Sequence, residues 1–439
     1  MFACLLALQT FAAEENSECH IGSYRLSDGS LLDIGPTGEE ALRWRRFDGT
    51  VGALHPAASG EWLSTYGWTD RKDGNTARFS SCDAGEITFA GVKGHRIALD
   101  ATDSKFISHD TSLAGRLVMP KGAKPVPVVV LVHGAEHDSA IRFNFLQRML
   151  PAEGVGVFVY DKRGTGASAG SYTQDFNLLA DDAVAAMREA RRVAGSRAAR
   201  IGYQGASQGG WVAPMAANRA PVNFVIVSFG LAVSVNDEDQ QEIEMEMRDK
   251  GHSAEEIAKA QEIGRTVETV VASGFTKGFA ELDAVRARYR NQPWYKDVHG
   301  NFTYVFLPHS GAELRAMAKD FDWATPFDYD PMPTLRANST PQLWILGGRD
   351  YEAPAVETSR RIRSLIDDGR PFTLALYPQA EHGMTLFETT SDGERISTRY
   401  AAGYFEMMRD FVRSGRIAGT YGDAQITRPR AQEGSSISP

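Results

Sequence analysis

The segment Gly205–Gly209, with the sequence GASQG, constrains the fold of this chain more than any other segment. It follows the short run Ile201–Gln204 and precedes a helical pattern that begins at Gly210. A serine on a tight turn between a strand and a helix adopts a strained backbone conformation, and small neighbours leave room for it. The segment therefore predicts that Ser207 ends a strand with its hydroxyl clear of the sheet. The amide of Gln208, at a helix N-terminus, can then face a developing oxyanion.

A second segment, Gly166–Gly170, has the related sequence GASAG. It lies well past the end of the apolar run Val155–Tyr160, in a loop rich in glycine and serine where no helical pattern starts. We therefore interpret Ser168 as a loop serine and Ser207 as the candidate nucleophile.

The partners of the serine are expected in the chain order Ser, then Asp or Glu, then His. His382 is C-terminal to every plausible acid, and it follows the alternating run Phe372–Tyr377, which predicts a strand. Asp350 follows the apolar run Gln342–Leu346, so we expect it on a loop at a strand end. Asp350 would accept the Nδ1 proton of His382 and stabilise the imidazolium that forms when the serine is deprotonated. Glu352 is the alternative acid.

A second oxyanion donor is expected after an earlier strand. The continuous run Val128–Val132 is typical of a parallel strand that is buried on both faces, and it ends in the sequence HGA. The amide of Ala135 is the candidate donor. His133 and His137 lie beside it, and we interpret both as residues that shape the loop.

Together these motifs resemble the α/β-hydrolase superfamily over about residues 106–416. The residues that carry the resemblance occur in the order of the family: the His-Gly pair at 133–134, the loop at 161–168, the turn at Ser207, the loop at Asp350 and the His-Gly pair at 382–383. Within the superfamily the chain is similar to bacterial serine esterases and to the hydrolase domains related to the acylaminoacyl-peptidase group. The resemblance implies a doubly wound, mostly parallel sheet with helices on both faces.

We expect a serine hydrolase that cleaves a small-molecule carboxylic ester through an acyl-enzyme intermediate. Ser207 would attack, His382 would act as general base and then as general acid, and Asp350 would orient the imidazole. The amides of Ala135 and Gln208 would hold the oxyanion. A serine peptidase or amidase would use the same residues, and an acyltransferase would differ only in its acceptor, so both alternatives remain open.

The alternation of strands and helical patterns that begins at Phe106 stops for about a hundred residues. We expect residues 233–330 to form a helical cap over Ser207, helical in pattern from Glu238 to Lys259. The core would then consist of residues 101–232 and 331–418, followed by a disordered tail at 419–439. Aromatic residues of the insertion would line an apolar pocket or form the insertion's own core: Trp294, Tyr295, Phe302, Tyr304, Phe306 and Trp323.

Residues 19–100 differ from the rest and predict a small β-rich domain. Asp-Gly pairs at 28–29, 48–49 and 73–74 separate short strand-like stretches, as in successive β-hairpins. Residues 1–13 have the apolar core and small-residue end of a secretory signal peptide, without a basic first region. Removal of that segment would leave Cys19 and Cys82 as a pair, so we expect a disulfide and a periplasmic or secreted location. The alternative is a cytoplasmic protein with two free thiols.

The composition limits the partners of the chain. Its 439 residues carry a formal net charge of −9, and no basic run interleaved with aromatic residues is present, which argues against a nucleic-acid partner. No apolar segment reaches the ~20 residues of a membrane span. No group of His, Cys and Asp residues has the sequence spacing of a metal site, so we expect neither a metal nor another cofactor.

Overall fold

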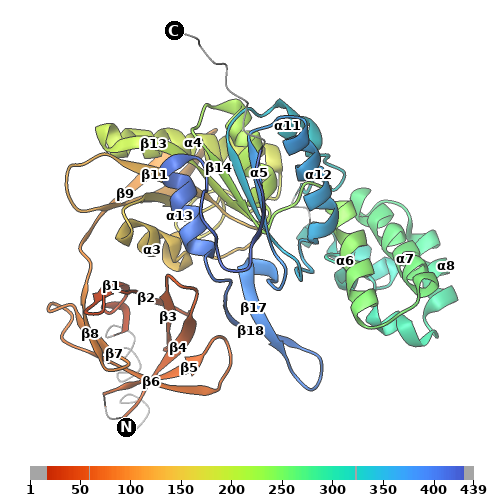
Figure 1. Ribbon diagram of the computed structural model, residues 1–439. Helices are drawn as coiled ribbons and strands as arrows, with labels where there is room; N and C mark the ends of the chain where they lie inside the picture. Colours follow the sequence, from red (N-terminus) through yellow and green to blue (C-terminus); the bar gives the residue numbers. More distant parts are fainter. Residues whose placement is uncertain (1–16, 59, 322–323, 430–439) are drawn as a thin grey trace, which may run out of the picture.

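A computed structural model describes residues 17–429 of the chain, apart from residues 59 and 322–323. Two sheets organise these residues: a closed barrel of strands β1 to β8 and a nine-stranded sheet. A group of helices is inserted between strands β14 and β15 of the larger sheet and lies at its side (Figure 1). The predicted signal peptide at 1–13 lies outside the described residues. None of the helices in the described part combines the length and the apolar character that a membrane span requires.

The N-terminal barrel is built from consecutive antiparallel hairpins and closes where β1 pairs with β8. A compact apolar core that includes Tyr24, Leu54 and Phe89 fills its interior. The prediction of a β-rich N-terminal unit is therefore confirmed. The strands of the barrel are β1 (Gly22–Leu26), β2 (Leu31–Pro36), β3 (Leu42–Arg46), β4 (Val51–Pro56), β5 (Trp62–Tyr66), β6 (Lys72–Phe79), β7 (Glu86–Phe89) and β8 (Val92–Arg96).

Two of the three Asp-Gly pairs form hairpin turns of the barrel. Gly29 and Gly49 have positive φ angles of 86° and 90° between β1 and β2 and between β3 and β4. The interpretation of the third pair as a hairpin turn is wrong, because Asp73-Gly74 lies inside β6. The register between β5 and β6 shifts near this point, and the φ angle of Gly74 is 82°, so the glycine accompanies an irregularity in the pairing.

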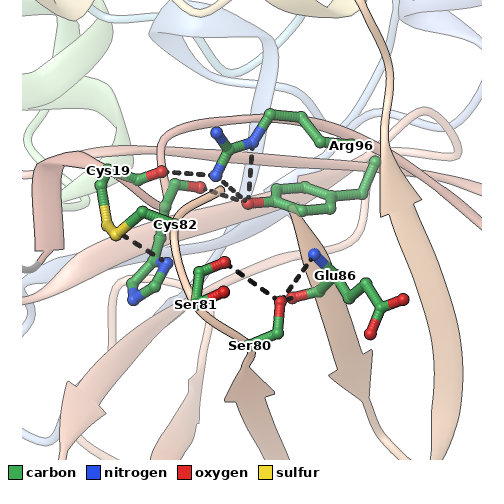
Figure 2. Close-up of a disulfide and its surroundings, with 8 residues drawn as sticks. Cys19, Ser80, Ser81, Cys82, Glu86 and Arg96 are labelled. Carbon is green, nitrogen blue, oxygen red and sulfur yellow. Dashed lines mark hydrogen bonds between the residues drawn. A yellow bond between two sulfur atoms is a disulfide. The ribbon is translucent and has the colours of Figure 1, made fainter. Parts of the chain in front are cut away.

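A disulfide between Cys19 and Cys82 ties the segment before β1 to the loop between β6 and β7 (Figure 2). The two Cα atoms are 5.5 Å apart. Arg96 of β8 supports the same segment, because its guanidinium donates to the backbone oxygen of Cys19 and to the Tyr24 hydroxyl. The predicted disulfide is therefore present.

The nine-stranded sheet has the order β19-β16-β15-β14-β13-β11-β12-β10-β9. Its central strands, from β16 to β12, are parallel, and the flanking strands β19, β10 and β9 are antiparallel to their neighbours. The strand bounds are β9 (Leu99–Ser108), β10 (Thr111–Pro120), β11 (Val126–Val132), β12 (Gly156–Tyr160), β13 (Ala198–Ala206), β14 (Val225–Ser228), β15 (Gln342–Gly347), β16 (Phe372–Tyr377) and β19 (Gln425–Thr427).

Helices cover both faces of this sheet, and strand β11 shows why its sequence is continuously apolar. Val128 and Val130 belong to the core on the face covered by α4 (Phe176–Ala194), α5 (Gly209–Arg219) and α12 (Ala355–Asp367). Val129 and Leu131 belong to the core on the opposite face, covered by α3 (Leu146–Ala152) and α13 (Tyr404–Ser414). Short helices α2 (Ala140–Phe143) and α11 (Met332–Ala337) complete the layers. The predicted doubly wound, mostly parallel sheet is confirmed.

The insertion between β14 and β15 is helical, as predicted, but its first helical stretch is divided. The helical pattern predicted from Glu238 to Lys259 is shared between α6 (Val235–Asp249) and α7 (Ala254–Ala272). The break lies at Gly251, whose φ angle of 82° is incompatible with a continuing helix. The insertion continues with α8 (Phe279–Tyr289), α9 (Thr303–Phe306) and α10 (Gly311–Met317).

The C-terminal segment adds two features that the sequence did not indicate. Strands β17 (Thr385–Thr389) and β18 (Arg395–Tyr400) form a hairpin that reaches the barrel, where the Tyr400 amide donates to the oxygen of Gly49 (Figure 1). The prediction of a disordered tail at 419–439 is wrong up to Thr427. Strand β19 pairs with β16 and adds an edge strand to the sheet. Residues 430–439 lie outside the described part.

Candidate active site

The residues expected to take part in catalysis all follow parallel strands of the sheet. Ala135, Ser207, Asp350 and His382 come after β11, β13, β15 and β16 respectively. Because the carboxyl ends of parallel strands meet at the same edge of a sheet, these residues gather on one side of the molecule. The helical insertion follows β14, so it leaves the sheet at the same edge.

Ser207 occupies the strained turn that its sequence context predicted. Its φ angle is 50°, in the left-handed region, and its amide donates to the backbone oxygen of Ser228 over 3.1 Å. The flanking glycines are required by close contacts: a Cβ atom on Gly205 would lie 2.1 Å from the oxygen of Gly209. A Cβ atom on Gly209 would lie 2.3 Å from the oxygen of Val132. The turn therefore packs β13, α5 and β11 tightly together around the serine.

The two residues with candidate oxyanion amides lie beside Ser207. Gln208 is the N-cap residue of α5, and Ala135 belongs to the loop after β11. Both line the same cavity as Ser207. A Cβ atom on Gly134 would lie only 3.2 Å from the Cβ of Ser207, so the loop lies directly against the serine.

Buried polar side chains hold the loop after β11 in place. The Lys162 ammonium donates to the Gly134 oxygen over 2.6 Å, and the Tyr172 hydroxyl donates to the Ala135 oxygen over 2.6 Å. His133 is buried with Nε2 2.6 Å from the Tyr160 oxygen, in agreement with a loop-shaping role. Burial lowers the pKa of Lys162 to about 8. These contacts fix the backbone that carries the Ala135 amide.

Ser168 has a structural role in the loop after β12. Its hydroxyl donates to the Asp161 backbone oxygen over 2.6 Å and accepts from the Ala114 amide over 2.9 Å. The Asp161 carboxylate in turn accepts from the amides of Ile141 and Ala167. The interpretation of Ser168 as a loop serine therefore agrees with its contacts.

Asp350 and His382 form a directly bonded pair. His382 Nδ1 lies 3.1 Å from each carboxylate oxygen of Asp350, which is fully buried. The Ala353 amide donates to the same carboxylate over 2.8 Å and fixes its orientation. The ring of Phe229 packs with its edge against the imidazole, with ring centroids 4.8 Å apart. This geometry holds the imidazole in a tautomer with its proton on Nδ1.

The alternative acid, Glu352, lies at the other nitrogen of the imidazole. Its carboxylate is 3.5 Å from His382 Nε2 and is mostly exposed. Burial alone would lower the pKa of His382, but the charge and hydrogen bond of Asp350 raise it to about 9. The carboxylates of Glu352 and Glu238 act in the same direction.

Ser207 and His382 both contact the chain at the end of β14. The Ser207 amide bonds the oxygen of Ser228, while the ring of Phe229 contacts the imidazole. Among the described residues, no hydrogen bond joins the Ser207 hydroxyl to His382. The structure thus joins His382 to Asp350 directly and brings Ser207 to the same strand edge without a direct bond to the imidazole.

A cavity of about 330 Å³ opens at Ser207. Core residues such as Phe176 and Trp211 form one wall, and aromatic residues of the insertion form another. The insertion residues that line it are Val235, Glu238, Val271, Asn301, Phe302, Tyr304, Val305, Phe306, Phe321, Thr325 and Phe327. Of the aromatic residues singled out from the sequence, Trp294 instead packs against Tyr289, and Trp323 lies outside the described residues.

Sequence reasoning missed a group of buried acids on α6. Glu238 lines the cavity and is buried, and Glu242 follows one helical turn later. Burial raises the pKa of Glu238 well above its usual range, and the charge of Glu242 acts in the same direction. Burial likewise raises the pKa of Glu242 to about 10. The sequence could have indicated this group, because the acids at 238, 242 and 246 are spaced four residues apart. Residues at that spacing share one face of a helix.

Comparisons with known proteins identify the family of the chain. The profile of the family described as "Serine aminopeptidase, S33" matches residues 123–390, a segment that includes Ala135, Ser207, Asp350 and His382. No curated protein sequence matches the chain.

Solved structures similar to the chain include two enzymes of archaea. An acylaminoacyl peptidase of Pyrococcus horikoshii is 14% identical with a TM-score of 0.46, and the match covers 90% of this chain but only 58% of the peptidase. An esterase of Pyrococcus furiosus is 16% identical with a TM-score of 0.42, and the match covers 65% of this chain and 84% of the esterase. The chain is also similar to Est1E of Butyrivibrio proteoclasticus, solved with ferulic acid, at 15% identity and a TM-score of 0.41, over 71% and 97% of the two chains.

Proposed function

Because the chain belongs to the α/β-hydrolase family described as "Serine aminopeptidase, S33", we propose that it is a serine hydrolase that cleaves carboxylic esters. One observation carries the proposal. Ser207 stands on a strained turn and lines a cavity rich in aromatic side chains, and a bonded Asp350–His382 pair lies at the same sheet edge. A serine, an oriented imidazole and an apolar binding site are the elements that acyl transfer from an ester requires.

In the proposed reaction, His382 Nε2 accepts the proton of the Ser207 hydroxyl as its oxygen attacks the ester carbonyl. Asp350 keeps the other imidazole proton on Nδ1 and stabilises the imidazolium. The imidazolium then protonates the leaving alcohol, the acyl group stays on Ser207, and a water activated by His382 releases the acid. The imidazole must move to within hydrogen-bond distance of the serine for the first step, as catalytic bonds often tighten only when substrate binds.

The amides of Ala135 and Gln208 are the proposed oxyanion donors. They belong to the residues that line the cavity on both sides of Ser207, and Lys162 and Tyr172 fix the loop that carries Ala135. A fixed amide needs no reorganisation when negative charge develops on the carbonyl oxygen, and one such donor contributes about 10²–10³ in kcat.

We propose that residues 233–330 act as a cap, between core segments 101–232 and 331–418 and after the β-rich domain at 19–100. Phe302, Phe306 and Phe327 of the cap line the cavity together with Phe176 and Trp211 of the core. These side chains form an apolar surface that favours an acyl or aryl group over a charged one.

An aminopeptidase is the second candidate, and the acids beside the serine favour it. Glu238 and Glu352 both line the cavity that contains Ser207. An aminopeptidase must bind the free α-ammonium group of its substrate close to the scissile bond, and the exposed carboxylate of Glu352 is the group that would do so. In the ester proposal, the role of Glu238 and Glu352 is instead to raise the pKa of His382.

Matched substrates distinguish the two candidates. We expect p-nitrophenyl butyrate to be hydrolysed with a far higher kcat/KM than the p-nitroanilide of butyric acid or of alanine. Faster turnover of alanine p-nitroanilide than of the ester, together with its loss in Glu352→Gln, would establish the aminopeptidase and overturn the esterase.

We also propose that the chain is exported to an oxidising compartment, where the disulfide between Cys19 and Cys82 persists. Intact mass after alkylation tests this proposal on protein recovered from its native compartment. We expect no label at these cysteines before reduction and two labels after it. Two labels without reduction would contradict export.

A further inference from the structure

Three side chains of the insertion converge at a point that the proposed reaction does not use. Glu242 and Glu246 occupy successive turns of α6, and His299 lies on the turn that precedes α9. Their potential ligand atoms all lie within 4.8 Å of one another. His299 Nδ1 is 3.7 Å from Glu242 Oε1 and 3.4 Å from Glu246 Oε2.

Three polar atoms of this group lack hydrogen-bond partners in the described part of the chain. Glu242 Oε2, Glu246 Oε2 and His299 Nδ1 are all buried and unpartnered. The side chain of Glu242 is only 4% exposed, so water cannot solvate its carboxylate freely. Buried polar atoms are almost always satisfied in folded proteins, because an unpartnered one loses its hydration without compensation. A cation bound between the three side chains would give His299 Nδ1, Glu246 Oε2 and the carboxylate of Glu242 a partner.

The histidine is held in place by contacts other than the acids. Asp239 of α6 accepts hydrogen bonds from the amides of Phe302 and Thr303, each over 2.9 Å, and so fixes the turn that carries His299. The imidazole stacks on Tyr304 with ring centroids 4.2 Å apart and an interplanar angle of 4°. The imidazole is therefore preorganised, which lowers the cost of binding an ion.

Nearby cations do not occupy the group. The Lys250 ammonium lies 3.6 Å from Asp297, and the Arg395 guanidinium lies 3.3 Å from Asp249. The side chain of His299 is 45% exposed although its Nδ1 atom is buried, so the imidazole separates the three ligand atoms from solvent. Rotation of this partly exposed ring would let an ion enter from that side.

We propose that Glu242, Glu246 and His299 bind one Zn²⁺ ion, with water completing its coordination. Zinc bonds of about 2.0–2.2 Å to nitrogen and oxygen place neighbouring ligand atoms of a tetrahedral site roughly 3.3–3.5 Å apart. The His299 separations of 3.4 and 3.7 Å are close to that value. Imidazole is a preferred ligand of zinc, whereas Ca²⁺ and Mg²⁺ prefer sites made of oxygen atoms alone.

The ion would brace a wall of the cavity. It would join α6 to the turn that leads into Tyr304 and Phe306, and both of these residues line the cavity at Ser207. Glu238, one turn before Glu242 on the same helix, lines that cavity as well. The site is thus structural, and it does not depend on which substrate the cavity accepts.

Titration of the full-length protein with ZnCl₂ after removal of metal by chelation tests the proposal. Isothermal titration calorimetry should give one equivalent of bound zinc in the wild type, and the melting temperature should rise with zinc. Glu242→Gln and His299→Gln should each weaken binding at least tenfold and abolish the rise. Circular dichroism checks that each variant is folded. If Glu242→Gln does not fold, His299→Gln still tests the proposal, because the side chain of His299 is about half exposed and its replacement should be tolerated.

Glu244→Gln and His309→Gln are the matched controls. Glu244 is an exposed acid on the same helix that pairs with Arg248, and His309 follows α9 without belonging to the group. Both controls should bind zinc as the wild type does. Absence of zinc binding in the wild type, or equal binding in His299→Gln and the wild type, would overturn the proposal and leave His299 as a counter-ion of the two acids.

Discussion

Ser168 and Ser207 occur in nearly the same run of small residues, yet their hydroxyls have opposite surroundings. The Ser168 hydroxyl is engaged by Asp161 and Ala114, whereas Ser207 faces a cavity from a left-handed turn. A serine that already donates a strong local hydrogen bond is a poor nucleophile, while one that lines a cavity can meet a substrate. The difference comes from where each serine stands relative to a strand end.

Replacement of these serines separates the two roles. We expect Ser207→Ala to lower kcat for an aryl ester on the order of 10⁶-fold while the protein remains folded. Ser168→Ala should keep kcat/KM nearly unchanged but destabilise the fold by about 1–3 kcal/mol, because a buried amide loses its acceptor. Steady-state kinetics and thermal unfolding measure the two effects. Full activity of Ser207→Ala would exclude this serine as the nucleophile.

The environment of His382 predicts a pH profile that is shifted toward alkaline values. The general base must be neutral, and the surrounding carboxylates raise its pKa to about 9. kcat/KM should therefore rise with pH from neutrality and level off only near or above pH 9, because protonated enzyme is converted to the active form over that range.

Glu352→Gln tests the cause of this shift. Removal of the carboxylate beside Nε2 should move the acid limb of the kcat/KM profile to lower pH, because one of the charges that raise the pKa of His382 is lost. The control is Glu357→Gln, which replaces an acid of α12 that pairs with Arg360. It should leave the pH dependence of kcat/KM unchanged. An unchanged profile in Glu352→Gln would refute the electrostatic account.

At the scale of elements, the insertion supplies one wall of the cavity and so should determine the preferred acyl group. Phe327 lines the cavity and is only partly buried, so its truncation should be tolerated by the fold. We expect Phe327→Ala to shift the preference among p-nitrophenyl esters toward longer acyl chains, because the cavity gains volume. Tyr295→Ala, a partly buried aromatic residue of the insertion that does not line the cavity, should leave the chain-length profile unchanged.

The barrel depends on its disulfide more than the larger sheet does, because its own core is small. The bridge joins residues separated by 63 positions, and a constraint of that length stabilises a fold by about 4 kcal/mol in the chain-entropy treatment. We expect Cys19→Ser combined with Cys82→Ser to lower the unfolding free energy of the barrel by up to that amount. Denaturant unfolding with and without reductant measures it. A wild type whose stability is insensitive to reduction would contradict the prediction.

At the scale of the whole molecule, chain order and strand ends were enough to predict most of the fold and the candidate site. The runs at Val128–Val132 and Gln342–Leu346 lie in β11 and β15, and the residues chosen after such runs gather at one sheet edge. Parallel strands that are buried on both faces have continuously apolar sequences, so they can be located from the sequence. Their carboxyl ends share one edge of the sheet, so the residues that follow them lie together.

The features that could not be predicted depend on contacts between distant segments. His299 lies 53 residues after Glu246 in sequence (299 − 246 = 53), and only packing of the insertion brings the two together. Strand β19 is short and polar, and it forms because β16 offers an unpaired edge. The Asp73-Gly74 pair is the opposite case, in which a local signal was misleading. Its sequence is typical of a turn, but the pair lies at an irregularity inside β6.

The central claim is that Ser207 carries the acyl group during turnover. The most direct measurement is reaction of the full-length protein with a fluorophosphonate, followed by peptide mass spectrometry of the adduct. We predict a single stoichiometric adduct on Ser207 and none in Ser207→Ala. An adduct on another residue, or undiminished labelling of Ser207→Ala, would contradict the assignment.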